Sequence, residues 1–519
     1  MTSIVSSIAY LGGRFRTLAV IVSALTRDKR GLAGLLIVVV YGLLGGLGPL
    51  LLPYHPIYSQ NLADALAMPE WIASSDTPRN INQTLDNWYI VYNETSGNVS
   101  IKTYYVGNKF IIEIQGIGEA NITIMARDYI YYPYKPANSL SISSYYDAGP
   151  IDNRSMAWYR IAYYLINLDL IGKWANVTTG GKNYTAPLGI YVFYDDPGFR
   201  VGALNPYIRD VVERKPIGGR QPTYVLNEKQ PYPIPSAINP VRELLLAKDT
   251  RLSVGLNISY YCDPTSFLMR CENGGVKFII RPINIFIYGQ AFGLLGTDYL
   301  GADVWTKFVY GARSAIIFGF SVALAIIFIG LFVGITAGYF GGTLRDYVLT
   351  FITDVIYFIP TLPLILAAGI VFGRSIVVIY IVIVLLSWPG TARVIRSWTM
   401  ALRSELYVEA AQALGAGTGR ILIKHIMPQL VPYMVYAVVV GVPGAVFTEV
   451  AIQLLGFGDP YWPSWGKILN EAFYGGAITS GAWWWIMPPI FGIVTLALGF
   501  ALMGIALDEI ANPRLRRRL

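Results

Sequence analysis

The sequence predicts a polytopic α-helical membrane protein that carries one large polar domain between its first two membrane spans. Of its 519 residues, 54% are hydrophobic and only 14% are charged, which is more apolar than a soluble protein of this length. Long uncharged runs alternate with short basic segments, a pattern that favours six spanning helices. One stretch of roughly 220 residues, long enough for an independent domain, departs from this pattern.

Residues 1–30 are predicted to be cytoplasmic because five basic residues face a single acid, Asp28. Within this segment, Leu18–Leu25 is too short to span a bilayer and is expected to lie on its inner surface as an elbow helix. The uncharged run Leu32–Pro53 is the first span, so residues 31–53 are assigned to it. Its basic flank places the N-terminus inside the cell.

Residues 54–291 are predicted to form a β-rich domain outside the cell. The sequence there is rich in Tyr, Asn, Ser, Thr and Pro. Short segments with β-branched and aromatic residues are separated by Gly, Asn and Pro, which is typical of strands and turns. The predicted strands include Ser100–Tyr105, Phe110–Gln115, Ile122–Ile124 and Val276–Ile287.

Eight Asn-X-Ser/Thr sequons all fall in this polar stretch. One sequon is weak evidence, but their confinement to one region predicts that the region is extracellular and N-glycosylated. They begin at Asn82, Asn93, Asn98, Asn121, Asn153, Asn176, Asn183 and Asn257. Cys262 and Cys271 lie in the same region, where an oxidising compartment favours a disulfide over two free buried thiols.

Composition also excludes several classes of function. Two His and two Cys residues are too few for a metal cluster or a Cys/His catalytic set, so no metal is expected. The net charge of +8 does not indicate a nucleic-acid partner, because the basic residues gather beside the spans. A lipid bilayer is the partner that this distribution predicts.

Five further spans complete the prediction, and the basic segment 512–519 is placed in the cytoplasm with the N-terminus. These spans are Ala312–Phe340, Tyr347–Gly373, Ser375–Ile395, Gln429–Phe457 and Trp483–Leu507.

The segment 404–428 is the longest polar interruption of the apolar C-terminal half. Ser404 is a plausible N-cap for a helix in which Glu405 and Glu409 share one face. An adjacent face carries an apolar stripe, and three glycines then break the helix before a second helical piece that runs to Pro428. The stripe is Leu406, Ala410, Ala413 and Leu414, and the glycines are Gly415, Gly417 and Gly419.

The run Glu409-Ala410-Ala411, then Gly415 and His425-Ile426-Met427-Pro428, resembles the EAA loop of ABC-importer permeases, in the form typical of the dipeptide/oligopeptide/nickel (OppC/DppC-like) family. The resemblance covers residues 30–71 and 292–515 and extends to other motifs. These are Leu295-Gly296-Thr297-Asp298, Tyr310-Gly311-Ala312-Arg313, Trp388-Pro389-Gly390, Leu455-Gly456-Phe457-Gly458, Pro463-Ser464-Trp465-Gly466 and Asp508 with Asn512-Pro513-Arg514.

The resemblance implies the type I ABC importer fold, with 292–511 as permease core and 404–428 as the coupling helix that docks on an ATPase subunit. Family members have the Leu-Gly-Thr-Asp motif soon after the first span, so residues 71–291 are an insertion. The implied coupling residues are Glu405, Glu409, Ala410, Ala411, Gly415, His425 and Pro428. Two departures from the family pattern are Asn512-Pro513 in place of Asp-Pro and Ala302 in a Gly-Arg-Asp motif.

The implied partners are a second permease, two ATP-binding subunits and an extracellular solute-binding protein. Gly415-Ala416-Gly417-Thr418-Gly419 lacks the lysine of a phosphate-binding loop, so ATP and Mg are expected on the partner subunits and no enzyme activity on this chain. The implied substrates are oligopeptides or oligosaccharides, such as cello-oligosaccharides in archaea. The dense sequons and the apolar, Tyr-rich composition point to an archaeal source, and the sequence does not decide between the substrates.

Pathway candidates are charged or helix-bending residues within the spans. Asp354 either lines the pathway or pairs with Arg345 or Arg396, and packing is the favoured interpretation because a membrane-buried acid is costly. Glu449 is a gate candidate near an outer end. Helices could rock, or be statically kinked, at Pro360, Pro363 and Pro443.

The alternative function is a membrane-anchored extracellular glycoprotein or enzyme acting through the insert. Paired carboxylates such as Asp195-Asp196, or Asp147 with Asp152, would suit glycoside hydrolysis. Their closeness in sequence predicts surface turns instead.

Overall fold

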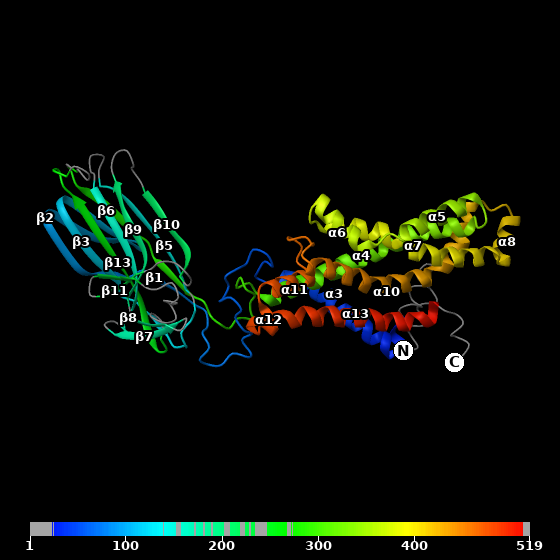
Figure 1. Ribbon diagram of the computed structural model, residues 1–519, viewed down its shortest axis with the longest axis horizontal. Helices are drawn as coiled ribbons and strands as arrows, with labels where there is room; N and C mark the ends of the chain where they lie inside the picture. Colours follow the sequence, from blue (N-terminus) through cyan, green and yellow to red (C-terminus); the bar gives the residue numbers. More distant parts are fainter. Residues whose placement is uncertain are drawn as a thin grey trace. The chain divides into compact units, whose positions relative to one another are not determined.

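The computed structural model describes residue 23 and residues 25–511, except for 139, 152–156, 171–172, 180–181, 188–189, 202–207, 218–223, 228–229, 234–246, 267–270 and 272. The chain divides into two compact units, a helical one (1–60 and 302–519) and one built of strands (61–301) (Figure 1). Most of the predicted elbow helix, the 512–519 tail and the Asn153 sequon lie outside the described residues.

Five described helices are long and apolar enough to cross a membrane, and a sixth span results if a bent helix pair counts as one. The long helices are α3 (Lys29–Leu51), α4 (Val304–Tyr339), α7 (Ile376–Arg403), α10 (Met427–Leu454) and α13 (Trp483–Ala511). The bent pair is α5 (Leu344–Tyr357) and α6 (Thr361–Phe372). Shorter helices are α8 (Leu406–Ala413), α9 (Thr418–Ile421), α11 (Trp465–Tyr474) and α12 (Ala477–Ser480).

Capping residues explain where two of these helices begin. Hydropathy places the start of the second span at Ala312, but α4 begins eight residues earlier because Asp303 caps it by accepting a 3.0 Å hydrogen bond from the Thr306 amide. The third hydrophobic segment breaks as expected: α5 and α6 meet at 75°, and Pro360 is the N-cap of α6. Pro363 lies in the first turn of α6, where its missing N–H would have no helical partner.

Helices α4 and α7 touch through a row of glycines on α4. A Cβ atom on Gly334 would lie 2.6 Å from the Ala392 carbonyl oxygen, and one on Gly338 would lie 2.6 Å from the Arg396 carbonyl oxygen. Gly330 meets Thr391 in the same way. Since lipid tails provide no hydrophobic force between helices, close backbone approach at small residues is what holds such a pair together.

We expect Gly334→Ala to loosen the α4–α7 contact because its methyl group would collide with backbone on α7. Gly390, on α7 itself, has no heavy atom within 4 Å of a built Cβ and is the matched control. Overpacking costs about 1–3 kcal/mol, whereas alanine at an open helical glycine stabilises by up to about 1 kcal/mol. Thermal unfolding in detergent should therefore show a lower midpoint for Gly334→Ala alone; equal midpoints for the two variants would contradict this packing.

Thirteen of the described strands in the second unit form one hydrogen-bonded antiparallel sheet, and β7 and β8 form a separate hairpin. The central order is β1-β15-β5-β14-β3-β13-β6-β9-β11-β12, with β2 against β3, β4 against β13 and β10 against β5. The strands are β1 Ile81–Leu85, β2 Trp88–Val106, β3 Lys109–Ala126, β4 Ile130–Tyr132, β5 Leu140–Pro150, β6 Ala157–Asn167, β7 Trp174–Thr179, β8 Lys182–Pro187, β9 Ile190–Val201, β10 Ile208–Ile217, β11 Tyr224–Asn227, β12 Gln230–Pro233, β13 Thr250–Cys262, β14 Gly275–Ile280 and β15 Ile283–Ile287.

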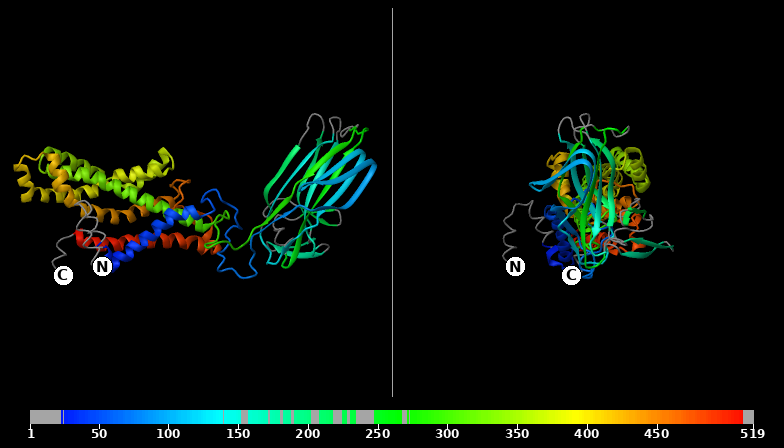
Figure 2. Two further views of the ribbon diagram at one scale, coloured as in Figure 1. Left: turned by 180° about the vertical axis from the view of Figure 1, so that it is seen from behind. Right: turned by 90° about the vertical axis from the view of Figure 1, so that its left-hand side faces the viewer.

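The sheet folds back on itself around an apolar core (Figure 2). Four strand-to-strand steps separate β5 from β6 in the sheet, yet the rings of Tyr146 on β5 and Tyr159 on β6 lie 6.5 Å apart. The corner lies in β3, whose first half pairs with β14 and whose second half pairs with β13. Gly116 and Gly118 lie between these halves with φ of 126° and 138°, a backbone that other residues rarely adopt.

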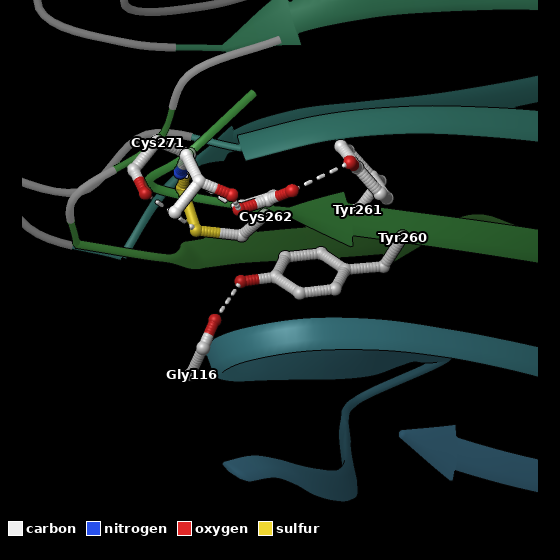
Figure 3. Close-up of a disulfide and its surroundings, with 7 residues drawn as sticks. Gly116, Tyr260, Tyr261, Cys262 and Cys271 are labelled. Atoms are coloured by element: carbon white, nitrogen blue, oxygen red, sulfur yellow. Dashed lines mark hydrogen bonds between the residues drawn. A yellow bond between two sulfur atoms is a disulfide. The ribbon is translucent and has the colours of Figure 1, made fainter. Parts of the chain in front are cut away.

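A disulfide and a tyrosine close this corner (Figure 3). Cys262, the last residue of β13, is bonded to Cys271 with a Cα–Cα distance of 5.1 Å. The neighbouring Tyr260 donates a 2.6 Å hydrogen bond to the Gly116 carbonyl oxygen. The Tyr260 hydrogen bond therefore holds the end of β13 against β3, and the disulfide ties the same end to Cys271, nine residues further along the chain.

The two chain segments that bound the strand unit lie side by side. Met68 and Ala291 form a β-bridge, and the Thr297 hydroxyl accepts a 2.8 Å hydrogen bond from the Ala67 amide while donating a 2.7 Å bond to the Asp64 carbonyl. Thr297 belongs to the Leu-Gly-Thr-Asp motif. The chain thus leaves and re-enters this unit at one place, which is the geometry that an inserted domain requires.

The observed strands extend or divide the predicted ones. Residues 110–115 and 122–124 belong to a single strand, β3, while 276–287 form two strands, β14 and β15. The expectation that the aspartate pairs lie in surface turns is wrong. Asp195 and Asp196 lie within β9, and Asp147 is buried on β5, where Arg281 binds its carboxylate at 2.9 Å.

Candidate coupling surface and inner charge pairs

Helix α8 contains the core of the predicted coupling segment. It begins one residue later than expected: Ser404 ends α7, with its hydroxyl donating to the Ala401 carbonyl at 2.9 Å, and Glu405 is the N-cap of α8. The Ser404 N-cap prediction is therefore wrong, because α7 continues to Arg403 and its last carbonyl groups use the Ser404 side chain and amide.

Two residues anchor α8 to the rest of the helical unit. Val408 is fully buried and Ala411 nearly so. Val408 belongs to an apolar cluster with residues of α4, α7 and the chain leading into α10, namely Leu331, Ile335, Ile395, Ile421, Ile426 and Leu430. Gln412 adds a long 3.4 Å hydrogen bond to the Tyr339 hydroxyl. The two residues that anchor α8, Val408 and Ala411, are thus three positions apart in the sequence.

The predicted apolar stripe points the other way. Leu406 and Leu414 are 81% and 89% exposed, and Ala410 and Ala413 are exposed as well. Glu405 and Glu409 are also exposed. The outer side of α8 therefore offers two leucines and two carboxylates on a helix held from behind, a combination that suits contact with another protein.

Gly415 ends α8 through its backbone conformation. Its φ is +82°, and its amide donates to the Gln412 carbonyl at 2.9 Å while the Ala416 amide reaches the Ala411 carbonyl at 3.0 Å. No heavy atom lies within 4 Å of a built Cβ, so the position needs glycine for its left-handed backbone and not for space.

Beyond Gly417 the chain becomes helical again and stays so into α10. α9 passes through a wider turn at Leu422–Ile426 directly into α10, so the second helical piece does not stop at Pro428 as predicted. Pro428 cannot donate a backbone bond, and its ring crowds the preceding turn, which the wider turn accommodates. His425 lies half-buried in that turn and Pro428 is exposed.

Helices α5 and α7 are joined by two aspartate–arginine pairs. Asp346 is buried and binds Arg396 with both oxygens, at 2.6 Å to Nε and 2.8 Å to Nη2. It also accepts hydrogen bonds from the Gly342 amide at 3.0 Å and the Thr350 hydroxyl at 3.2 Å. This carboxylate is therefore fully occupied with neighbours.

Asp354 forms the second pair, with Arg393 at 2.7 Å. The sequence predicted pairing with Arg345 or Arg396, and this is wrong: Arg396 binds Asp346, and the Arg345 guanidinium lies over the Phe340 ring. Asp354 and Arg393 are 46% and 37% exposed and border a cavity of about 200 Å³ beside α4. The observed partner of Asp354 is thus Arg393, and the pair lies beside a cavity.

The two pairs should differ in their effect on stability. Arg396→Ala leaves the Asp346 carboxylate buried and unpaired, which costs about 3–5 kcal/mol. Arg393→Ala removes a half-exposed pair and should cost about 1 kcal/mol or less. Thermal unfolding in detergent measures both, with Asp346→Asn as a test of rescue in the Arg396→Ala background. Equal losses for the two arginine variants would refute the distinction.

Glu449 is buried on α10, one turn from the buried Gln453. One Glu449 oxygen and the Gln453 amide nitrogen have no hydrogen-bond partner within the described chain. Gly458 and Gly466 allow the close packing here, since a Cβ on Gly466 would lie 2.8 Å from the Val450 Cα.

Pro443 lies inside a continuous α10.

Trp465 connects several family motifs, which sequence reasoning did not foresee. Its indole donates to the Phe308 carbonyl at 2.9 Å, and Cβ atoms on Gly311 and Gly492 would lie 2.4 and 2.9 Å from its ring. The ring therefore fits between α4 and α13 only because both helices present glycine. Gly311 of the Tyr-Gly-Ala-Arg motif was the available signal.

Comparison with known proteins agrees with this architecture. The family described as binding-protein-dependent transport system inner membrane component matches residues 326–517. The dipeptide transport system permease protein DppC of Bacillus subtilis (strain 168) is 33% identical over 223 residues, 43% of this chain and 69% of that protein. The oligopeptide transport system permease protein OppC of the same organism is 32% identical, over 43% of this chain and 72% of that protein.

Among solved structures, an inward-facing form of the MetNI methionine ABC transporter is similar with a TM-score of 0.32 and 20% identity, over 40% of this chain and 94% of that one. The chain belongs to the family of binding-protein-dependent transport system inner membrane components, as a permease of the DppC and OppC type. It is a multi-pass ABC-importer permease subunit and not an enzyme, and the ATPase sites of such importers lie in partner subunits.

Proposed function

We propose that this chain forms half of the translocation pathway of an ATP-driven importer and receives the force of ATP binding through α8. The observation that carries the proposal is the outward face of α8, where two exposed leucines and two exposed carboxylates stand on a helix anchored by Val408. A helix that is packed against the helices behind it and exposes its outer face can pass the movement of a docked partner on to those helices.

The partners in this proposal are a second permease, two ATP-binding subunits that hold ATP and Mg, and an extracellular solute-binding protein. The substrate is an oligopeptide or an oligosaccharide. The similarity to dipeptide and oligopeptide transport permeases favours peptides.

The proposed topology has six membrane helices, with α5 and α6 together as the third, both termini in the cytoplasm and residues 54–291 outside. The sequons support this sidedness: exposed ones are Asn82, Asn93, Asn98, Asn121 and Asn176. Asn257 is half-buried and its amide already donates to Asn121 and Thr123, and Asn183 lies on β8. The bonded Cys262 and Cys271 suit an oxidising exterior, and the sequon density suits an archaeal membrane.

Within the pathway, we assign Pro360 as a hinge, because the 75° bend lies there, with Pro363 stiffening the turn that follows. Pro443 weakens α10 at a point where it can bend. Glu449 is the gate candidate because of its incompletely paired carboxylate, and Asp354 lines the inner cavity with Arg393.

Reversing one charge on α8 tests the function. Glu409→Lys should reduce the copurification of ATP-binding subunits with the full chain from native membranes by about tenfold, because it places a cation on an acidic docking face. Leu414→Asp should act in the same direction. In both variants, ATP-driven uptake in reconstituted vesicles should fall together with the copurification of ATP-binding subunits.

The matched control is Glu70→Lys, a charge reversal at an exposed acid of the strand unit. It should leave copurification unchanged, and all three variants should keep the melting midpoint of the parent. A chain that purifies without ATP-binding subunits, or a Glu409→Lys form that retains them fully, would refute the importer assignment or the role of α8.

The sidedness is tested by peptide mass spectrometry of native protein. We expect glycans on several exposed sequons, lower occupancy at Asn257 because its amide nitrogen makes two hydrogen bonds, and no alkylation of Cys262 or Cys271 without reduction. Bare sequons throughout, together with two alkylatable thiols, would place this unit inside the cell.

A further inference from the structure

A hollow of about 570 Å³ lies on the strand unit, formed by β2, β3, β13 and β6. Its size falls within the range of small-ligand pockets, roughly 300–1,000 Å³. It is lined by Glu94, Thr95, Ser96, Glu119, Ala120, Asn121, Trp158, Tyr159, Arg160, Ser259, Tyr260 and Tyr261.

The strand register shows which side of the sheet the hollow occupies. Three rows cross the four strands, and the middle row contains Ala120, Tyr260 and Tyr159, whose side chains are buried in the apolar core. Because side chains alternate between faces, the rows on either side point away from that core. The outer rows are Glu94-Asn121-Ser259-Arg160 and Ser96-Glu119-Tyr261-Trp158. The hollow is therefore on the face away from the core, and only these two rows reach it with side chains.

Recognition in this hollow must come from side chains, because interstrand hydrogen bonds already use the backbone of β3 and β13. The side chains of the two outer rows combine two carboxylates (Glu94 and Glu119) with an amide, three hydroxyls and one guanidinium. Hydrogen-bond acceptors and hydrogen-bond donors thus lie close together on neighbouring strands. A ligand whose groups both donate and accept, at short and regular intervals, matches this mixture.

Two aromatic rings supply the apolar part. Trp158 and Tyr261 are neighbours on adjacent strands of the same outer row and are each partly exposed. The Trp158 indole nitrogen is buried without a hydrogen-bond partner among the described residues.

The polar side chains are held in place before any ligand arrives. The Tyr92 hydroxyl donates to the Glu94 carboxylate, and the Asn257 amide donates to the Asn121 oxygen at 2.6 Å. The Tyr261 hydroxyl donates to Asp263 at 3.1 Å, a bond that raises the pKa of Tyr261. The Cys262–Cys271 disulfide begins at the next residue. A preorganised side-chain array loses less entropy on binding.

We propose that this hollow binds a carbohydrate chain, with Trp158 and Tyr261 against sugar-ring faces and Glu94, Glu119 and Asn121 on hydroxyl groups. The C–H face of a sugar ring is apolar and weakly positive, which suits the negative face of an aromatic ring. Its hydroxyls donate to carboxylates and accept from amides, hydroxyls and guanidinium. A peptide would add to a strand edge instead, and this hollow lies on a sheet face.

The carbohydrate has two possible sources, and Asn121 distinguishes them. Asn121 lies in the lining and begins the sequon Asn121-Ile122-Thr123, so an N-glycan attached there starts inside the hollow. The other source is an oligosaccharide from outside the protein. This binding site rests on the proposed function in one respect only, namely that the strand unit lies outside the cell. Carbohydrate binding can be measured without transport and without ATPase subunits.

The test uses the full chain purified in detergent, with and without the sequon. Thr123→Val removes the sequon and leaves Asn121 in place. Cellohexaose and maltohexaose are titrated by calorimetry, with hexaglycine as a peptide comparison. We expect the Thr123→Val form to bind at least one hexasaccharide with a Kd below about 1 mM, and Trp158→Ala or Glu119→Gln in that background to weaken binding at least about tenfold. Tyr129→Ala, an exposed aromatic outside the hollow, is the control.

Hexasaccharide binding by the parent protein distinguishes the two sources of the carbohydrate. If mass spectrometry finds a glycan on Asn121 and only the Thr123→Val form binds, the hollow holds the chain's own glycan; if the parent also binds, the carbohydrate comes from outside. The proposal is overturned if neither hexasaccharide binds the Thr123→Val form at about 10 mM, or if Trp158→Ala and Glu119→Gln leave binding unchanged while their melting midpoints stay at the parental value.

Discussion

The helical unit depends on close contact between helix faces that carry glycine. Gly330, Gly334 and Gly338 bring the backbones of α4 and α7 together, and Gly34 does the same for α3 against Gly499 of α13. In a bilayer, such contacts replace the hydrophobic force that folds soluble proteins. With α4 and α7 fixed side by side, α8 packs against them through Val408, which belongs to the same cluster as Leu331 and Ile395.

The charge pairs have a different role from the glycines. Asp346 and Asp354 attach α5 to α7 through Arg396 and Arg393, and the chain beyond α5 bends at Pro360. An ion pair has a defined geometry but can part and re-form, whereas glycine contacts lock two backbones. The half-exposed Asp354–Arg393 pair is thus the link between α5 and α7 that parts more easily, whereas the buried Asp346–Arg396 pair holds the two helices more firmly.

Hydropathy indicated the long apolar helices, and motif order indicated the family, because both are local properties of the sequence. The buried side of α8 could not be predicted from the sequence, because Leu406, Val408 and Ala411 in this eight-residue helix and Leu414 directly after it put apolar residues on more than one side, and only the fold selects Val408 and Ala411 as the buried ones. Asp354 was matched to the wrong arginine for a similar reason: Arg393 and Arg396 lie one turn apart on α7, and the rotation of α5 decides which acid meets which base.

The hollow illustrates why binding sites on sheets escape a sequence-based search. Glu94, Asn121, Ser259 and Arg160 lie far apart in the chain and become neighbours through three separate strand registers. A slip of one residue in any of them would turn that strand's polar side chains toward the core. The glycine corner of β3 and the hydrogen bond from Tyr260 to Gly116 help to hold β3 against β13, so features that fold the sheet also assemble the site.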